Sequence, residues 1–210
     1  MITVCIFAKS PVAGQVKTRL AATIGAQQAA MLAAAFLADT WESVQRLPWA
    51  RGVIASTGAL RAALVPGADV WPQGEGPLDE RLERVLRRAV MDGPAIAIGA
   101  DSPGLPVELL DAAHEGLMRG EPVIGPAEDG GFYLLGVTAF PPGLLAGVPW
   151  SARDTCEVTI SRMTIHGMAP MRLPSWFDVD DEGDLSRLRA FLATQPERAP
   201  RTAAVLEWMG

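Results

Sequence analysis

TVCIFAKSPVAGQVKTRL, residues 3–20, joins an apolar run to a loop that contains three cations, and this junction decides the fold class. The apolar residues 3–8 predict a first β-strand, and the proline and glycine after it predict a turn. In open α/β sheets, ligands bind beyond the carboxyl ends of strands, where loops and helix N-termini present unpaired N–H groups to anions. The loop therefore predicts a phosphate-binding segment, with Lys9, Lys17 and Arg19 as its cations.

The loop matches neither of two well-known phosphate-binding patterns. Lys17 and Thr18 follow Val16 rather than glycine, so the loop is not a Walker A motif, and it lacks the G-x-G-x-x-G pattern of dinucleotide sites. Pro11 and Gly14 shape the turn, and the small residues around them would let the backbone come close to a phosphate. Taken alone, the segment is equally consistent with an ordinary solvated basic loop.

Short apolar runs alternate with longer helix-patterned runs along the whole chain, which is typical of an α/β layer fold with a largely parallel sheet. At 210 residues, a single domain spanning residues 1–210 is expected. Besides 3–8, strands are expected at residues 52–56, 69–71, 95–99, 123–124 and 132–137. Helices are expected at residues 27–46, 77–91, 106–118, 154–165 and 182–194, with the last two closing the fold.

Composition and charge exclude some classes of function. Apolar residues make up 49% of the chain and charged residues 20%, which is the composition of a globular protein with a sizeable core. The formal net charge of −6 argues against sequence-independent binding of nucleic acid, because such binding needs many Lys and Arg residues to displace counterions. Any phosphate that the chain binds is therefore expected to belong to a small ligand.

The sequence also predicts a cytoplasmic protein without a membrane span. No basic segment precedes the first apolar run, and residues 29–38, the longest helix-like apolar stretch, are too short to cross a bilayer. Cys5 and Cys156 are expected to be reduced, buried thiols. His114 and His166 are expected to be surface or packing residues, because neither stands near a cluster of acids.

A second candidate site is IGADSPGLP, residues 98–106, at the end of the strand predicted at 95–99. Asp101 stands where a parallel strand opens into the ligand crevice. Carboxylate oxygens are the protein ligands that Mg²⁺ prefers, with phosphate oxygens and water as the others, so Asp101 is a candidate metal ligand. The alternative is that Asp101 and Ser102 only cap the following helix, since both residue types are favoured caps.

A third candidate site is GPAEDGGFYLLG, residues 125–136, which has paired glycines directly after two acids. Gly130 and Gly131 would let a ligand lie against the backbone, while Glu128 or Asp129 faces an acceptor hydroxyl or the metal. The alternative is a simple hairpin turn, for which Asp-Gly is a strong signal.

The fourth candidate site is WFDVDDEGDL, residues 176–185, with five acids in ten positions. Alternation in an extended segment would put Asp178 and Asp180 on one face, where they could converge on one cation. Acids from Asp180 to Asp184 also precede a predicted helix, whose N-terminal dipole favours negative charge. We expect the cluster to be divided between these two roles.

These four segments and VPWSARDT, residues 148–155, occur in an order that resembles a family of small GT-A-like transferases, the radical-SAM/selenodomain-associated and arsenosugar-biosynthesis glycosyltransferases. The likeness covers nearly the whole chain. The family is also similar to nucleotidyltransferases that make guanylyl-lactate derivatives, molybdopterin dinucleotides and activated sugars. The resemblance implies a three-layer α/β/α GT-A (nucleotide-diphospho-sugar transferase) fold with a mostly parallel sheet.

The resemblance further implies roles for individual residues and a divalent metal, Mg²⁺ or Mn²⁺. The expected nucleotide-binding residues are Ala8, Lys9, Gly14, Lys17, Arg19, Gly99, Asp101 and Ser102. The expected metal ligands are Asp101 and Asp180, with Asp178 adjacent. The expected acceptor contacts are Gly130, Gly131 and Trp150, and the expected catalytic residues are Asp129 and Glu128.

Three positions depart from the family pattern. Asp181 stands where the family usually has the Thr of DVDT, Ser102 stands where Cys is common, and Phe132 stands where Tyr is frequent. These changes keep the acids in place, but they alter the residues that cap the last predicted helix and contact the acceptor.

Two transfer reactions fit these residues. In the preferred one, the metal neutralises the leaving diphosphate of a nucleotide-sugar while a hydroxyl of a small-molecule acceptor attacks the sugar carbon. If the configuration inverts, this reaction needs a base, for which Asp129 or Glu128 is the candidate. In the other, a phosphate or phosphonate attacks the α-phosphorus of an NTP, which the cationic loop suits. A nucleotide-binding protein without catalysis is a third hypothesis, and the presence of Asp101, Asp178 and Asp180 counts against it.

Overall fold

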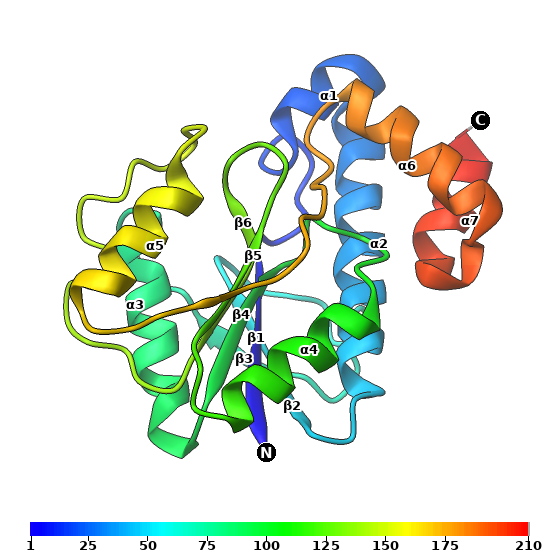
Figure 1. Ribbon diagram of the computed structural model, residues 1–210. Helices are drawn as coiled ribbons and strands as arrows, with labels where there is room; N and C mark the ends of the chain where they lie inside the picture. Colours follow the sequence, from blue (N-terminus) through cyan, green and yellow to red (C-terminus); the bar gives the residue numbers. More distant parts are fainter. Residues whose placement is uncertain (210) are drawn as a thin grey trace.

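The first apolar run is buried along almost its whole length, because it becomes an interior strand of a sheet that is covered on both faces. The computed structural model describes residues 1–209 (Figure 1). Its seven strands follow the order β3-β2-β1-β4-β6-β5-β7. Neighbouring strands are parallel except that β6 runs antiparallel to both β4 and β5. The strands are β1 (Ile2–Ala8), β2 (Ala50–Ser56), β3 (Asp69–Pro72), β4 (Ala95–Gly99), β5 (Val123–Pro126), β6 (Phe132–Val137) and β7 (Met171–Arg172).

Helices cover both faces of this sheet, so the predicted three-layer α/β/α arrangement is confirmed (Figure 1). Along β1, Val4 and Ile6 pack with α2 and α4 on one face, whereas Cys5 packs with α3 and α5 on the other. Within residues 1–209, no helix combines the length and apolar character needed to cross a membrane. The helices are α1 (Thr18–Ile24), α2 (Ala26–Gln45), α3 (Leu78–Ala89), α4 (Val107–Met118), α5 (Thr155–Ile165), α6 (Glu182–Thr194) and α7 (Pro200–Met209), with 3-10 turns at Val90–Asp92 and Pro196–Arg198.

The sequence pattern does not predict α1, β7 or α7. β7 has two residues, and α1 and α7 bury few side chains, which leaves too weak a periodic signal. In α7, only Thr202 and Leu206 are buried. The expectation that two late helices close the fold is therefore wrong, because α7 follows α6 and packs against α2.

The cysteines and His114 take packing positions. Both thiols are buried and unpaired, as expected. Burial raises the pKa of Cys5 to about 12 and also raises the pKa of Cys156, so both thiols stay protonated at neutral pH. The His114 ring stacks on Trp49, with 4.6 Å between the ring centroids.

A third apolar core, separate from those on the two sheet faces, fixes the segment before α6. Phe177 and Val179 are buried in it with side chains from α1, α2, α6 and α7. Because successive side chains of an extended segment point to opposite sides, Asp178 and Asp180 point away from this core. The N–H of Val179 donates to the carbonyl oxygen of Asp101 at 3.0 Å, so the segment also lies beside the end of β4.

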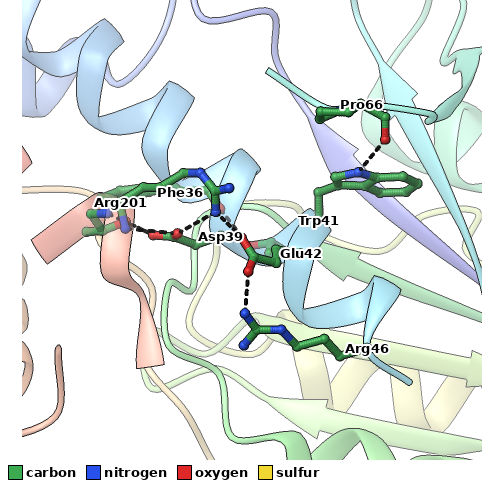
Figure 2. A network of polar contacts seen from close by, with 9 residues as sticks. Phe36, Asp39, Trp41, Glu42, Arg46, Pro66 and Arg201 are labelled. Carbon is green, nitrogen blue, oxygen red and sulfur yellow. Dashed lines mark hydrogen bonds and ion pairs between the residues drawn. The ribbon is translucent and has the colours of Figure 1, made fainter. Parts of the chain in front are cut away.

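A buried carboxylate in α2 forms hydrogen bonds that hold the C-terminal helix α7 against α2 (Figure 2). The Asp39 side chain, 2% exposed, accepts hydrogen bonds from the N–H groups of Arg201 (3.1 Å) and Thr202 (2.8 Å) and from the Thr202 hydroxyl (2.7 Å). These N–H groups belong to the first turn of α7, where a helix leaves its donors unpaired and favours negative charge. The Arg201 side chain also forms ion pairs with Asp39 and with the more exposed Glu42.

Replacing Asp39 by Ala is expected to lower the free energy of unfolding by about 3 kcal/mol, because three donors lose a buried charged acceptor. Glu42→Ala is the matched control, since it removes a solvent-exposed partner of the same Arg201 and should cost about 1 kcal/mol or less. Urea denaturation followed by circular dichroism measures both changes. An equal decrease in the free energy of unfolding in the two variants would contradict a stabilising role for the Asp39 hydrogen bonds to α7.

Candidate functional site

A cavity of about 480 Å³ lies where the carboxyl ends of β1 and β4 meet the loops that follow them. Its walls come from the β1–α1 loop, the start of α3, the β5–β6 loop and the segments before α5 and α6. This is the crevice in which open α/β sheets bind ligands. The charged residues that line it are Lys9, Lys17, Arg19, Arg81, Asp101, Asp129, Asp178 and Asp180.

Lys17 connects three parts of this cavity. It precedes α1 with a left-handed backbone, φ 49°, which costs a residue other than glycine on the order of 1 kcal/mol. Its side chain is 4% exposed, and its Nζ lies 3.1 Å from Asp101 Oδ1 and 2.9 Å from Asp180 Oδ1. Burial alone would lower the pKa of Lys17, but the two carboxylates outweigh burial and the pKa is raised. The buried ammonium therefore stays charged.

Asp180 has a second cation beside it. Arg19 Nη2 lies 2.5 Å from Asp180 Oδ2. Burial alone would raise the pKa of Asp180, but Lys17 and Arg19 more than offset this and hold the pKa below its ordinary value. Asp101, in contrast, keeps a side chain that is 58% exposed, so its carboxylate remains accessible to a ligand.

Asp178 is an acid of the cavity whose pKa is raised. The Ser102 hydroxyl donates to Asp178 Oδ1. Burial raises the pKa of Asp178 to about 6, the Ser102 hydrogen bond opposes the rise, and the negative charges of Asp101 and Asp129 add to it. These carboxylates repel one another, and a bound cation would relieve the repulsion.

The alternative that Asp101 and Ser102 cap the next helix is wrong. That helix, α4, begins at Val107, and the residue before it is Pro106, which offers no side-chain cap. Ser102 instead engages Asp178, so its hydroxyl positions a carboxylate of the cavity.

The acid-rich segment before α6 supplies the expected cap of that helix, while its other predicted role, binding a cation, stays a prediction. Asp181 accepts a hydrogen bond from the N–H of Asp184 at 3.1 Å, and Asp184 accepts one from the N–H of Asp181, which is a capping box. The earlier acids, Asp178 and Asp180, line the cavity.

The paired glycines lie in the hairpin loop between the antiparallel strands β5 and β6, so the simple turn is present. The loop also reaches the cavity, because Asp129 and Gly131 line it. The N–H of Gly131 donates to Asp129 Oδ1 at 2.8 Å. Gly130, with φ 97°, packs against Arg153, where an added Cβ would lie 2.1 Å from the carbonyl oxygen. Gly130 therefore admits the segment before α5 to close contact.

The two predicted catalytic acids have different surroundings. The Glu128 carboxylate forms hydrogen bonds of 2.5 and 2.8 Å with Arg187 of α6, and this pairing lowers the pKa of Glu128. Glu128 is not among the residues that line the cavity. Of the two acids, only Asp129 contributes to the cavity wall in the described part of the chain.

Of the other predicted site residues, some line the cavity and some do not. Ala8, Lys9, Gly99 and Trp150 line the cavity. Gly14 lies in an exposed turn with φ 79°, and nothing lies within 4 Å of the place where its Cβ would be. The structure thus places Gly14 outside the cavity wall.

The end of β3 and the start of α3 form a further wall of the cavity that the sequence pattern did not indicate. Gln73, 3% exposed, donates to the carbonyl oxygens of Ala8 (3.2 Å) and Ala55 (2.8 Å). Its Oε1 accepts a hydrogen bond from Arg81 Nη1 at 2.9 Å, which fixes that guanidinium at the wall. The available signal was a glutamine just after a short strand, followed by an arginine in the first turn of an amphipathic helix.

The carboxylates match the ligand type of a hard divalent cation, but a lysine stands among them. No group of three His, Cys, Asp or Glu residues in the described range 1–209 is placed to hold a metal ion. Lys17 lies between Asp101 and Asp180, the two predicted metal ligands. Carboxylate oxygens are the ligand type that Mg²⁺ or Mn²⁺ prefers, but in this structure the ammonium of Lys17 occupies the space between them.

The chain is similar to one protein family and to several solved structures. The family described as "Uncharacterized protein conserved in bacteria (DUF2064)" matches residues 40–152. A candidate nucleotide-diphospho-sugar transferase from Desulfovibrio desulfuricans G20 is 31% identical, with a TM-score of 0.90 over 99% of this chain and 95% of that chain. No curated protein matches the chain.

More distant structures share the fold. A 4-diphosphocytidyl-2C-methyl-D-erythritol synthase is 14% identical, with a TM-score of 0.53 over 91% of this chain and 99% of that chain. A homologue of Mycobacterium tuberculosis Rv0371c, from Mycobacterium sp. strain JC1, is 16% identical, with a TM-score of 0.53 over 92% of this chain and 98% of that chain. At these identities the likeness shows the fold alone.

Asp178→Asn is expected to stabilise the metal-free protein at pH 7.5 and to have little effect near pH 4. Because folding raises the pKa of Asp178 from 3.8 to about 6, the folded state binds this proton more tightly than the unfolded state. Wild-type stability therefore falls as pH rises through this window, and the amide avoids a loss of about 2 to 3 kcal/mol. Urea unfolding in the presence of EDTA at both pH values measures the difference. A pH-independent difference would contradict the raised pKa.

Proposed function

The chain belongs to the bacterial family DUF2064, and from this premise we propose that it is a metal-dependent glycosyltransferase with a nucleotide-sugar donor and a small-molecule acceptor. The narrower likeness to radical-SAM/selenodomain-associated and arsenosugar-biosynthesis glycosyltransferases is part of this proposal. The observation that carries it is the cavity at the carboxyl ends of the strands, where Lys17 and Arg19 meet Asp101 and Asp180.

The β1–α1 loop supports the binding of a diphosphate. Lys9, Lys17 and Arg19 line the cavity, and ammonium and guanidinium groups form strong charge-assisted hydrogen bonds with phosphate oxygens. β1 ends with the small side chain of Ala8, and β4 ends at Gly99, which has no side chain, so a ligand could approach the backbone there. A nucleotide-diphospho-sugar is also the substrate class in the name of the D. desulfuricans relative.

Asp101 and Asp180 would hold the divalent cation, Mg²⁺ or Mn²⁺, with Asp178 beside them. When bound, this cation would supply charge neutralisation to the diphosphate leaving group. Lys17 would then pair with a phosphate oxygen in place of the two carboxylates.

Asp129 is the residue we assign as base for an inverting transfer. It lines the cavity, and the Gly131 N–H orients it through one carboxylate oxygen. The acceptor oxygen forms a bond to the anomeric carbon, the bond from that carbon to the phosphate oxygen breaks, and the acceptor proton passes to Asp129. Gly131 and Trp150 also line the cavity and are assigned to the acceptor.

Nucleotidyl transfer is the second candidate, and the three cations of the β1–α1 loop favour it. An NTP carries more negative charge than a nucleotide-sugar, and an acceptor phosphate is already ionised, so that reaction depends mainly on cations and positioning. Lys9, Lys17 and Arg19 would meet this demand.

The proposed reaction needs only small molecules as partners. A net charge of −6 does not favour nucleic acid as a partner. The unpaired thiols of Cys5 and Cys156 are compatible with a reducing compartment, and we therefore place the protein in the cytoplasm.

A thermal-shift panel of NTPs, nucleoside diphosphates and nucleotide-sugars, each with EDTA, Mg²⁺ or Mn²⁺, tests the proposed function. One nucleotide-sugar and its diphosphate are expected to raise Tm in a metal-dependent way, because a ligand that binds only the folded state stabilises it. Asp101→Asn should lose the metal-dependent part of the shift. Asp92→Asn, an exposed acid outside the cavity, should keep it.

The panel also separates the two reactions. A shift confined to one NTP would favour nucleotidyl transfer over glycosyl transfer. If no nucleotide changes Tm under any condition, both candidates fail.

Lys17→Met is expected to increase the affinity for Mn²⁺ about tenfold or more without nucleotide, because the ammonium no longer competes for Asp101 and Asp180. The same variant should lose affinity for the diphosphate that binds in the panel. Electron paramagnetic resonance of free Mn²⁺ measures the first effect, with Arg61→Met, which removes an exposed cation outside the cavity, as the control. Equal Mn²⁺ affinity in wild type and Lys17→Met would contradict the competition.

A further inference from the structure

Two buried donors without partners belong to side chains that line the same cavity. Arg81 Nε and Trp150 Nε1 are shielded from solvent and have no hydrogen-bond partner among residues 1–209. A buried donor without an acceptor costs about 1 to 3 kcal/mol, so native structures rarely keep one without a reason such as a ligand. Trp176 Nε1 is the remaining such side-chain atom in the described chain, and Trp176 does not line the cavity.

Arg81 also lacks a compensating charge. None of the ion pairs found in the described residues includes Arg81. The side chain donates to the neutral amide oxygen of Gln73, which is itself fixed by the carbonyl oxygens of Ala8 and Ala55. A half-buried guanidinium that is oriented in this way and has no acid beside it favours an anionic ligand.

Apolar side chains lie near both donors, together with the polar Gln73. Leu78 and Leu82 are neighbours of Arg81 on α3 and line the cavity with it. Phe132 meets Trp150 edge to face, with 6.0 Å between the ring centroids. The carboxylates instead come from the end of β4, the β5–β6 loop and the segment before α6. The cavity lining from α3, Phe132 and Trp150 therefore combines side chains of one apolar cluster with two hydrogen-bond donors, one of them charged.

We infer that Arg81 and Trp150 form a subsite for the acidic group of the second substrate, a small molecule with a carboxylate or phosphate on an apolar or planar body. The inference rests on the proposed function, since it describes the acceptor side of the same cavity. Arg81 binds two oxygens of this group through its planar fork, and the Trp150 indole N–H donates to the same group. The nucleotide phosphates belong to the loop with Lys9 and Lys17, so the two anions occupy different walls.

The Trp150 indole N–H reports on this subsite by NMR. In ¹⁵N-labelled protein, Trp150→Phe identifies its signal among those of the six tryptophans. Acetate and inorganic phosphate are expected to move the signal saturably, whereas acetamide, which has the shape of acetate without its charge, is not. Arg81→Gln should raise the apparent Kd for both anions at least about tenfold. Arg87→Gln, an exposed arginine farther along α3, is the matched control and should leave it unchanged.

Two results would overturn the subsite. One is a response to acetamide equal to the response to acetate, and the other is an anion response that survives Arg81→Gln. A second arm repeats the acetate titration with the nucleoside diphosphate from the thermal-shift panel bound. A persistent response supports a separate site for the second substrate, and its loss overturns this assignment because Arg81 then serves the nucleotide. The titrations without nucleotide still decide the anion subsite if no diphosphate binds, so failure of the proposed function is distinguishable.

Discussion

The buried ammonium of Lys17 between Asp101 and Asp180 is the interaction on which the rest of the site depends. It joins the β1–α1 loop to the end of β4 and to the segment before α6, across 163 positions of sequence. The two ion pairs help to offset the left-handed backbone of Lys17 and the cost of burying its charge. Loss of Lys17 would therefore leave two carboxylates close together without the cation between them.

Apolar packing determines which side chains can take part in this interaction. Phe177 and Val179 enter the third core, so alternation turns the acids between and after them toward the cavity. Arg187 of α6 stacks over Phe177, 4.1 Å from the ring centroid, and also binds Glu128. Arg187 thereby connects the β5–β6 loop, which carries Asp129, to the same core. The proposed base and the proposed metal ligands are therefore positioned by one apolar core.

The fold class and the cavity acids Asp101, Asp129, Asp178 and Asp180 could be predicted from local sequence patterns. Glu128, also predicted for the site, instead pairs with Arg187 and does not line the cavity. Period and turn residues locate the strands, and the carboxyl end of a parallel strand points Asp101 toward the crevice. The ion pairs of Lys17 and the wall of Gln73 and Arg81 could not be predicted, since they need contacts between segments far apart in the chain. Helix α7 was missed for the same reason, because it depends on a carboxylate of α2 rather than on a strong apolar period of its own.

The proposal that Asp101 and Asp180 hold the divalent cation is tested most directly by the anomalous diffraction of Mn²⁺. The crystals are grown with the nucleoside diphosphate that binds in solution. We expect a Mn²⁺ peak between the carboxylates of Asp101 and Asp180, with Lys17 Nζ moved from them to a phosphate oxygen. Lys17 still paired with both carboxylates, and Mn²⁺ bound elsewhere or absent beside a bound diphosphate, would contradict it.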